Sequence, residues 1–241
     1  MLITLPNAFG DAVTNMAIDA ALLRSMPAGL AAFRHYAWLE PTASFGYAQR
    51  YNEVAQNSPT ELSLIRRLTG GGIVDHRNDW TYALILHNSL AASKRPATEL
   101  YQHVHQAIQQ TLQSMQIETQ LAPCPKACKS ATRAPSSINS ASQCFVHPAV
   151  NDVLRLDGQK IAGAAMKRSR AGLLIQGSID RSTLPDDFDF THFQPNLLTQ
   201  LAQALELPQG ELEDIRPLFK SEQIEKEKER FASQAWNQKR A

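Results

Sequence analysis

The stretch Arg66-Arg67-Leu68-Thr69-Gly70-Gly71-Gly72-Ile73-Val74-Asp75-His76 carries the strongest structural signal in this chain. It joins two apolar, strand-like runs, at 63–67 and 82–86. Three consecutive glycines exceed what a tight turn needs, although a turn that requires positive φ is one interpretation. The other is a ligand loop, because a backbone without side chains lets amide groups approach a carbonyl or a phosphate. The loop matches neither a Walker motif nor a dinucleotide fingerprint, because the residues that those motifs require do not follow.

A second glycine-bearing segment places a lysine directly before a strand. Asp157-Gly158-Gln159-Lys160 leads into Ile161-Ala162-Gly163-Ala164-Ala165, and a further strand is expected over 172–179. Lys160 could be only the charged tip of a hairpin, but the small residues after it leave space around its ammonium. A partly desolvated lysine can act as a fixed positive charge or as an acid or base. The two segments together suggest an acyl or acyl-phosphate site of backbone amides and one ammonium.

The composition is that of an ordinary soluble protein. The 241 residues are 43% hydrophobic and 20% charged, with a net charge of +1. That charge gives no case for binding nucleic acid or an anionic membrane. No apolar run approaches the roughly 20 residues that span a bilayer, and the first residues lack the basic start of a secretory signal. We therefore expect a cytoplasmic protein of enzyme size with one catalytic domain over 1–241.

The periodicity of apolar residues predicts a mixed α+β fold. Helical spacing starts near Gly10, with Asp11 or Thr14 as the cap. The predicted helices cover 10–25, 98–116, 197–205 and 222–236, and the predicted strands cover 32–38, 43–47, 63–67, 82–86, 153–156 and 172–179. We expect a core over about 10–206, followed by a charged and largely solvated helical segment at 210–241.

The segment 122–143 has no periodicity and is rich in Pro, Ser, Ala and Lys, so it predicts a long loop, a functional lid or a disordered segment. Cys124, Cys128 and Cys144 lie in or directly after it. An odd number of cysteines without a signal argues against a disulfide framework. Zinc would need four regularly spaced ligands, and only the first two cysteines have such spacing, so we predict no metal site. Cys144 is either a small core residue or, because it ends a serine-rich loop, an exposed nucleophile.

These residues resemble the biotin/lipoate A/B protein ligase family, which includes lipoate–protein ligases and octanoyltransferases of the lipoyl pathway. The similarity extends over roughly 10–179. Its most specific part is Arg66-Arg67-x-Thr69-Gly70-Gly71-Gly72-x-Val74-x-His76. The other matching segments are Asn15-Met16-Ala17-Ile18-Asp19, Phe33-Arg34-His35-Tyr36-Ala37-Trp38, Ser44-Phe45-Gly46-Tyr47-Ala48-Gln49 and Gly158-Gln159-Lys160-Ile161-Ala162-Gly163-Ala164-Ala165.

The resemblance implies a mixed-sheet catalytic module, a single domain with flanking helices, that encloses an acyl-binding tunnel. It implies that Lys160 is catalytic and stabilises negative charge on the acyl carbonyl. The acyl- and substrate-binding residues that it implies are Arg66, Arg67, Thr69, Gly70, Gly71, Gly72, His76, Gly163 and Ala164. The acceptor would be a lysine of a lipoyl carrier domain, in dehydrogenase E2 subunits or the glycine cleavage H protein.

Two branches of the family obtain the acyl group from different donors. A ligase activates lipoate with ATP and Mg²⁺, whereas an octanoyltransferase needs no cofactor and takes its octanoyl group from acyl carrier protein through a cysteine thioester. Gln143-Cys144-Phe145, and His76 followed by Thr81-Tyr82, resemble the cysteine-loop octanoyltransferases. The chain also ends before the accessory domain of two-domain ligases would, but its three glycines are more typical of ligases. We favour transfer through a catalytic Cys144, with ATP-dependent ligation as the alternative. Biotin ligation and a carrier-binding protein without catalysis are less favoured.

Overall fold

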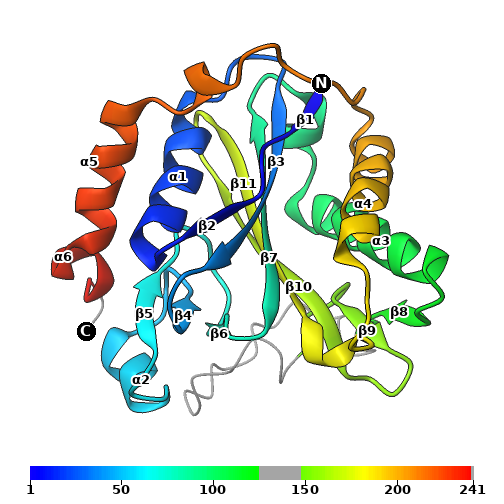
Figure 1. The fold of residues 1–241 in the computed structure, drawn as a ribbon, viewed down its shortest axis with the longest axis horizontal. Helices are drawn as coiled ribbons and strands as arrows, with labels where there is room; N and C mark the ends of the chain where they lie inside the picture. Colours follow the sequence, from blue (N-terminus) through cyan, green and yellow to red (C-terminus); the bar gives the residue numbers. More distant parts are fainter. Residues whose placement is uncertain (125–147, 240–241) are drawn as a thin grey trace.

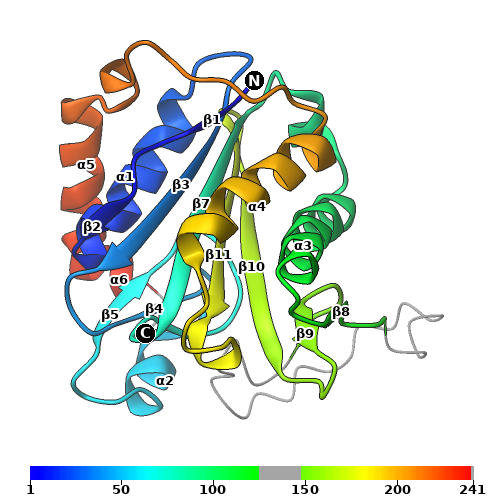
Figure 2. The same ribbon diagram turned by 45° about the vertical axis from the view of Figure 1, so that its right-hand side comes forward.

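The computed structural model describes residues 1–124 and 148–239. Within these residues, one large mixed sheet stands between two groups of helices, and a small sheet lies at one end of it (Figures 1 and 2). The strands of the large sheet are β1 (Leu2–Thr4), β2 (Ala8–Gly10), β3 (Ala31–Trp38), β7 (Asp79–His87), β8 (Thr119–Leu121), β9 (Val153–Arg155), β10 (Lys160–Arg168) and β11 (Gly172–Asp180). Strands and helices thus share one module, which confirms the predicted α+β class.

The large sheet has the order β1-β3-β7-β11-β10-β9-β8, with β2 also paired to β3. β1 and β2 run parallel to β3, and the other neighbours in the sheet are antiparallel. The strand after the second glycine segment, β10, pairs along its length with β11, which in turn pairs with β7. The sheet therefore brings the residues around Lys160 close to the strand that follows the first glycine loop.

Both faces of the large sheet are buried, which explains its nearly continuous apolar strands. Successive side chains of a strand point to opposite faces. In β7, Tyr82, Leu84 and Leu86 belong to one core cluster, and Ala83 and Ile85 belong to the other. The strand therefore holds together two hydrophobic cores, one on each side of the sheet.

Helices cover each face. α3 (Ala97–Ser114) and α4 (Phe190–Leu205) pack on one side, and α1 (Ala12–Ser25), α5 (Ser221–Ala232) and α6 (Gln234–Asn237) lie on the other (Figure 1). α1 begins where Asp11 accepts a hydrogen bond from the Thr14 amide at 2.7 Å, so Asp11 is the cap. Short 3₁₀ turns η1 (Ala91–Lys94), η2 (Arg181–Thr183) and η3 (Arg216–Leu218) connect these elements. No helix of the described residues is long and apolar enough to cross a membrane.

The small sheet carries the first glycine loop. It has the order β5-β4-β6, from β4 (Thr42–Phe45), β5 (Ser63–Arg66) and β6 (Val74–Asp75), and α2 (Tyr51–Gln56) lies beside it. β4 runs parallel to β5 and antiparallel to β6. The glycines at 70–72 connect β5 to β6, so they join two strands that both pair with β4.

The periodic segments are confirmed, with differences at their ends. The helix predicted over 197–205 starts earlier, at Phe190, because Asp189 caps it by accepting from the Thr191 and His192 amides. The strands β1, β2, β6 and β8, of two or three residues each, were not predicted.

The charged helical segment expected over 210–241 is largely solvated, as predicted, but it begins later and is interrupted. Helix α5 begins only at Ser221, and the chain breaks at Ser233 before α6. Phe231 and Trp236 are buried, and α5 packs along α1. The charge pattern gives no signal for these few apolar side chains, which belong to the same core cluster as residues of α1.

Candidate active site

Arg67 holds the glycine loop in place. Its guanidinium donates to the carbonyl oxygens of Gly70 at 2.9 Å and Gly72 at 2.8 Å. It also donates to the carbonyl oxygen and to Oγ of Ser44, each at 2.7 Å. Arg67 is thus a buried link between the loop and β4.

The loop packs closely on the chain that follows β4. A Cβ at Gly46 would lie 2.0 Å from the carbonyl oxygen of Gly71, so no side chain fits there. Gly71 has φ of 85°, a conformation that favours glycine. Part of the glycine run therefore serves a tight backbone approach, as the turn interpretation expects.

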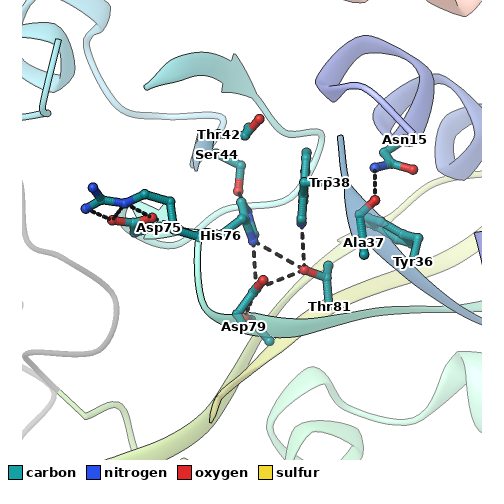
Figure 3. Close-up of polar contacts among 12 residues, drawn as sticks. Asn15, Tyr36, Ala37, Trp38, Thr42, Ser44, Asp75, His76, Asp79 and Thr81 are labelled. Carbon is teal, nitrogen blue, oxygen red and sulfur yellow. Dashed lines mark hydrogen bonds and ion pairs between the residues drawn. The ribbon is translucent and has the colours of Figure 1, made fainter. Parts of the chain in front are cut away.

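His76 lies at the centre of a buried hydrogen-bonded row (Figure 3). Its Nδ1 is 2.7 Å from Oδ2 of Asp79, and its Nε2 is 2.6 Å from Oγ of Ser44. Thr81 Oγ1 donates to the same Asp79 oxygen at 2.8 Å, and Ser178 Oγ does so as well. The Trp38 ring stacks on the imidazole with 4.1 Å between centroids. These contacts fix both the position and the orientation of the imidazole ring.

Lys160 forms a buried ion pair that the sequence did not indicate. Its Nζ lies 2.8 Å from Oδ2 of Asp152, and the two side chains are 4% and 0% exposed. The register between β9 and β10 shifts between Lys160 and Ala162, and such a bulge re-aims nearby side chains. A Cβ at Gly163 would lie 2.5 Å from Lys160 Nζ and 3.0 Å from Asp152 Oδ1. The glycine therefore makes room for the ion pair, as the small residues of this segment predicted.

Tyr101 of α3 supports this ion pair from the other side. Its hydroxyl donates to Asp152 Oδ1, while the Ala149 amide donates to Oδ2 at 2.6 Å. Burial, followed by the nearby Asp152 charge, raises the pKa of Tyr101 well above its usual value, so the phenol stays protonated. The His105 ring packs against Tyr101 with 4.1 Å between centroids. Burial lowers the pKa of His105 to about 4, so this imidazole is neutral near pH 7.

A narrow cavity brings the two halves of the site together. Its described lining residues are Met16, Tyr36, Trp38, Ser44, Arg67, Val74, His76, Thr81, Lys160, Gly163, Ala164, Ala165, Gln176, Gly177 and Ser178. Five sequence-predicted site residues are in this set, namely Arg67, His76, Lys160, Gly163 and Ala164. The cavity thus has one buried ammonium, one histidine and a wall of small and aromatic residues.

The other predicted binding residues do not line this cavity. The glycines contact the cavity wall through Arg67, which lines the cavity and donates to the Gly70 and Gly72 carbonyl oxygens. The Thr69 hydroxyl donates to Gln176 Oε1 at 2.9 Å. Gln176 lines the cavity and also donates to the buried Asp19 at 2.8 Å. Thr69 therefore acts on the cavity wall through Gln176.

Arg66 contacts the C-terminal helices. Its guanidinium donates to the carbonyl oxygens of Trp236 at 3.1 Å, Asn237 at 2.8 Å and Tyr47 at 2.8 Å. Trp236 Nε1 donates to the Arg66 carbonyl at 2.9 Å. The structure thus places Arg66 where it fastens α6 to β5.

The proposed nucleophile Cys144 lies outside the described residues, as does Cys128. Cys124, at the end of the described part before them, is exposed. The structure therefore leaves the roles of these cysteines as predictions from the sequence.

Sequence reasoning missed four functional candidates, namely Ser44, Asp79, Tyr101 and Asp152. Asp79 could have been found, because it follows His76 at a spacing that lets a carboxylate reach the imidazole. The others had no such signal, since they contact their partners only across strands and helices that are distant in sequence.

Comparison with known proteins places this site in a family. The octanoyltransferase LipM of Oceanobacillus iheyensis is 33% identical over 186 residues, which cover 74% of this chain and 63% of that protein. The chain thus spans less than two thirds of that relative's length. A structure of a bi-partite lipoate protein ligase and its E2 lipoyl domain from Thermoplasma acidophilum matches with a TM-score of 0.68 at 17% identity, covering 98% of this chain and 95% of that one.

Lipoate-protein ligase A bound with ATP matches with a TM-score of 0.67 at 16% identity, covering 98% of this chain and 97% of that chain. At such identities the two structures share only the fold with this chain, and that fold is the predicted mixed-sheet module. The family model described as the lipoyl protein ligase A/B catalytic domain matches residues 11–201. The chain therefore belongs to the lipoyl protein ligase A/B catalytic domain family.

Proposed function

We propose that this protein transfers an octanoyl group from acyl carrier protein, through a thioester on Cys144, to a lysine of a lipoyl carrier domain. The observation that carries the proposal is the buried ammonium of Lys160, which Asp152 holds on the wall of the cavity. A fixed positive charge in a desolvated site stabilises the oxyanion that forms when an acyl carbonyl is attacked. We further propose that 1–241 acts as one catalytic domain in the cytoplasm.

The surroundings of Lys160 favour this role over that of a mobile surface charge. Asp152 accepts from Lys160, from the Tyr101 hydroxyl and from the Ala149 amide. The carboxylate is therefore fixed by donors from α3 and from the chain before β9. It can hold the ammonium within a narrow range of positions, which is what electrostatic catalysis requires.

The two arginines beside the glycine loop favour transfer over ligation. A ligase would need cationic groups to bind the phosphates of ATP, and Arg66 and Arg67 are the cations beside the glycine loop. Arg67 donates to Gly70, Gly72 and Ser44, and Arg66 donates to carbonyl oxygens of α6 and of the chain after β4. The curated relative is also named an octanoyltransferase. ATP-dependent lipoate ligation with Mg²⁺ is the alternative.

The reaction would proceed in two acyl exchanges. The Cys144 thiolate attacks the carrier-bound thioester and releases the carrier thiol, while Lys160 stabilises the oxyanion. A deprotonated lysine of the acceptor then attacks the acyl–Cys144 carbonyl, the carbon–sulfur bond breaks, and an amide forms as the amine proton passes to the released Cys144 sulfur. Acceptors of this kind are the lipoyl domains of dehydrogenase E2 subunits and the glycine cleavage H protein.

Intact mass spectrometry after incubation with octanoyl-acyl carrier protein, without ATP, tests the proposal. We expect a hydroxylamine-labile octanoyl thioester on the wild type and on the control Cys124→Ser. The Cys144→Ser protein should form no thioester. Cys124 is a suitable control because it lies near the same segment and is exposed. If no adduct forms, and an apo carrier domain is modified only with lipoate and ATP, the protein is a ligase.

A further inference from the structure

We propose that Ser44, His76 and Asp79 form a second acyl-accepting centre, in which the Ser44 hydroxyl takes an acyl group from an activated ester or thioester and water releases it. This activity is separate from the transfer through Cys144 and does not require it. Ser44, His76 and Asp79 all belong to the described part of the chain.

The geometry is that of a nucleophile, a base and an orienting carboxylate. Ser44 Oγ lies 2.6 Å from His76 Nε2, and His76 Nδ1 lies 2.7 Å from Asp79 Oδ2. Figure 3 shows the Ser44 and His76 side chains pointing toward each other, with Asp79 on the far side of the ring. An imidazole whose Nδ1–H donates to a carboxylate has its Nε2 ready to accept the serine proton.

Asp79 is held as an orienting group. Its Oδ2 also accepts from the Thr81 and Ser178 hydroxyls, and Trp38 Nε1 donates to Thr81 Oγ1 at 2.9 Å. The carboxylate and the ring thus have fixed relative positions, and Trp38 covers one face of the imidazole. Ser44 and His76 thus face the cavity as a hydrogen-bonded pair whose relative position is fixed.

Arg67 favours Ser44 as a nucleophile. Its guanidinium donates to Ser44 Oγ at 2.7 Å, so the Ser44 proton is directed toward His76 Nε2. The positive charge also stabilises negative charge that develops on Oγ as the proton leaves. One lone pair of Oγ then remains for attack on a carbonyl. Ser44 and His76 both line the cavity that contains Lys160, so an acyl carbonyl in the cavity has access to the hydroxyl.

The reaction balances with water as the co-reactant. Ser44 Oγ forms a bond to the acyl carbon, the bond to the alcohol or thiol leaving group breaks, and the Ser44 proton passes through His76 to that leaving group. Water then attacks the acyl–serine ester, His76 accepts its proton, and Ser44 recovers that proton as the carboxylic acid departs.

Labelling of the Cys144→Ala protein by an alkyl fluorophosphonate tests this inference, with peptide mapping to locate the adduct. The probe reacts irreversibly with a serine that a histidine activates. We expect an adduct on Ser44 that is absent in His76→Gln. The same preparation should hydrolyse p-nitrophenyl octanoate, and Ser44→Ala should lower that rate on the order of 100-fold.

Thr42→Val is the matched control, because Thr42 is a buried hydroxyl residue on the same strand whose Oγ1 donates to the Glu40 carbonyl at 3.0 Å. It should keep both labelling and hydrolysis. If the wild type forms a thioester at Cys144 but the Cys144→Ala protein gives no adduct on Ser44, this inference is overturned and the transfer proposal stays intact. A Ser44 adduct without any Cys144 thioester would support this inference and overturn the cysteine route.

Discussion

Replacing Gly163 by alanine tests whether the position of the Lys160 ammonium controls activity. In the structure, a Cβ at Gly163 would lie 2.5 Å from both Cε and Nζ of Lys160. Ordinary contacts between such atoms are about 3.5 Å. The ammonium must therefore move by roughly 1 Å, and Asp152 Oδ1, at 3.0 Å from the added atom, blocks part of the space.

The expected effects on activity and stability differ in size. A displacement of about 1 Å in a catalytic group can lower a rate by on the order of 100-fold. The added methyl group overpacks a buried site, which lowers the free energy of unfolding by about 1–3 kcal/mol. For a chain of this size, the melting temperature should fall by about 2–4 °C for each kcal/mol.

Single-turnover octanoyl transfer to an apo lipoyl domain, together with thermal unfolding, measures both effects. Gly158→Ala is the control, because Gly158 has φ of +91° and open space where its Cβ would be. It should destabilise the turn before Lys160 by about 1 kcal/mol through backbone strain and leave the rate nearly unchanged. A Gly163→Ala protein that is folded and transfers at the wild-type rate would refute the reasoning about Lys160.

Three further predictions concern groups around the site. Asp152→Asn leaves the buried Lys160 ammonium without its counter-charge, which should lower the free energy of unfolding by about 3–5 kcal/mol and slow transfer, as denaturant titration and the same transfer assay would show. His105 has a pKa of about 4 when folded and about 6.5 when unfolded, so the unfolded chain binds more protons and stability falls as pH drops below 6.5. The loss should reach about 2 kcal/mol at pH 5 and be absent in His105→Leu, and equal pH slopes for both proteins would contradict the assignment. Trp236→Ala removes a buried ring and the donor to the Arg66 carbonyl, which should lower unfolding free energy by about 3–5 kcal/mol, with hydrogen exchange accelerated first in α5 and α6.

The cavity has two polar centres, one around His76 and one around Lys160. Each joins a residue that the sequence indicated to a partner that it did not indicate. His76 and Lys160 were candidates because each follows a glycine-bearing segment, and both line the cavity. Their partners come from elsewhere, since Ser44 lies on β4 and Asp152 lies just before β9. Such contacts produce no periodic pattern, so only the folded chain reveals them.

Arg66 and Arg67 show how neighbours in sequence acquire separate tasks. The sequence presents them as one basic pair beside glycines. Successive residues of an extended strand point to opposite sides, and in the structure Arg66 contacts α6 while Arg67 contacts the glycine loop. The C-terminal partner of Arg66 lies about 170 residues later, beyond the reach of any local rule.

The sequence by itself determined the main helices, the long strands and the family, because helices, long strands and glycine turns depend on residues within a few positions of one another. It also supplied Lys160, Gly163 and His76, and the cysteine route through Cys144 rests on it alone. The tertiary structure decided the Lys160–Asp152 ion pair, the Ser44–His76–Asp79 row and the burial of Phe231 and Trp236 of the C-terminal helices. The physical reason is that hydrogen bonds and packing between distant segments depend on sheet order and register, which no short stretch of this chain encodes.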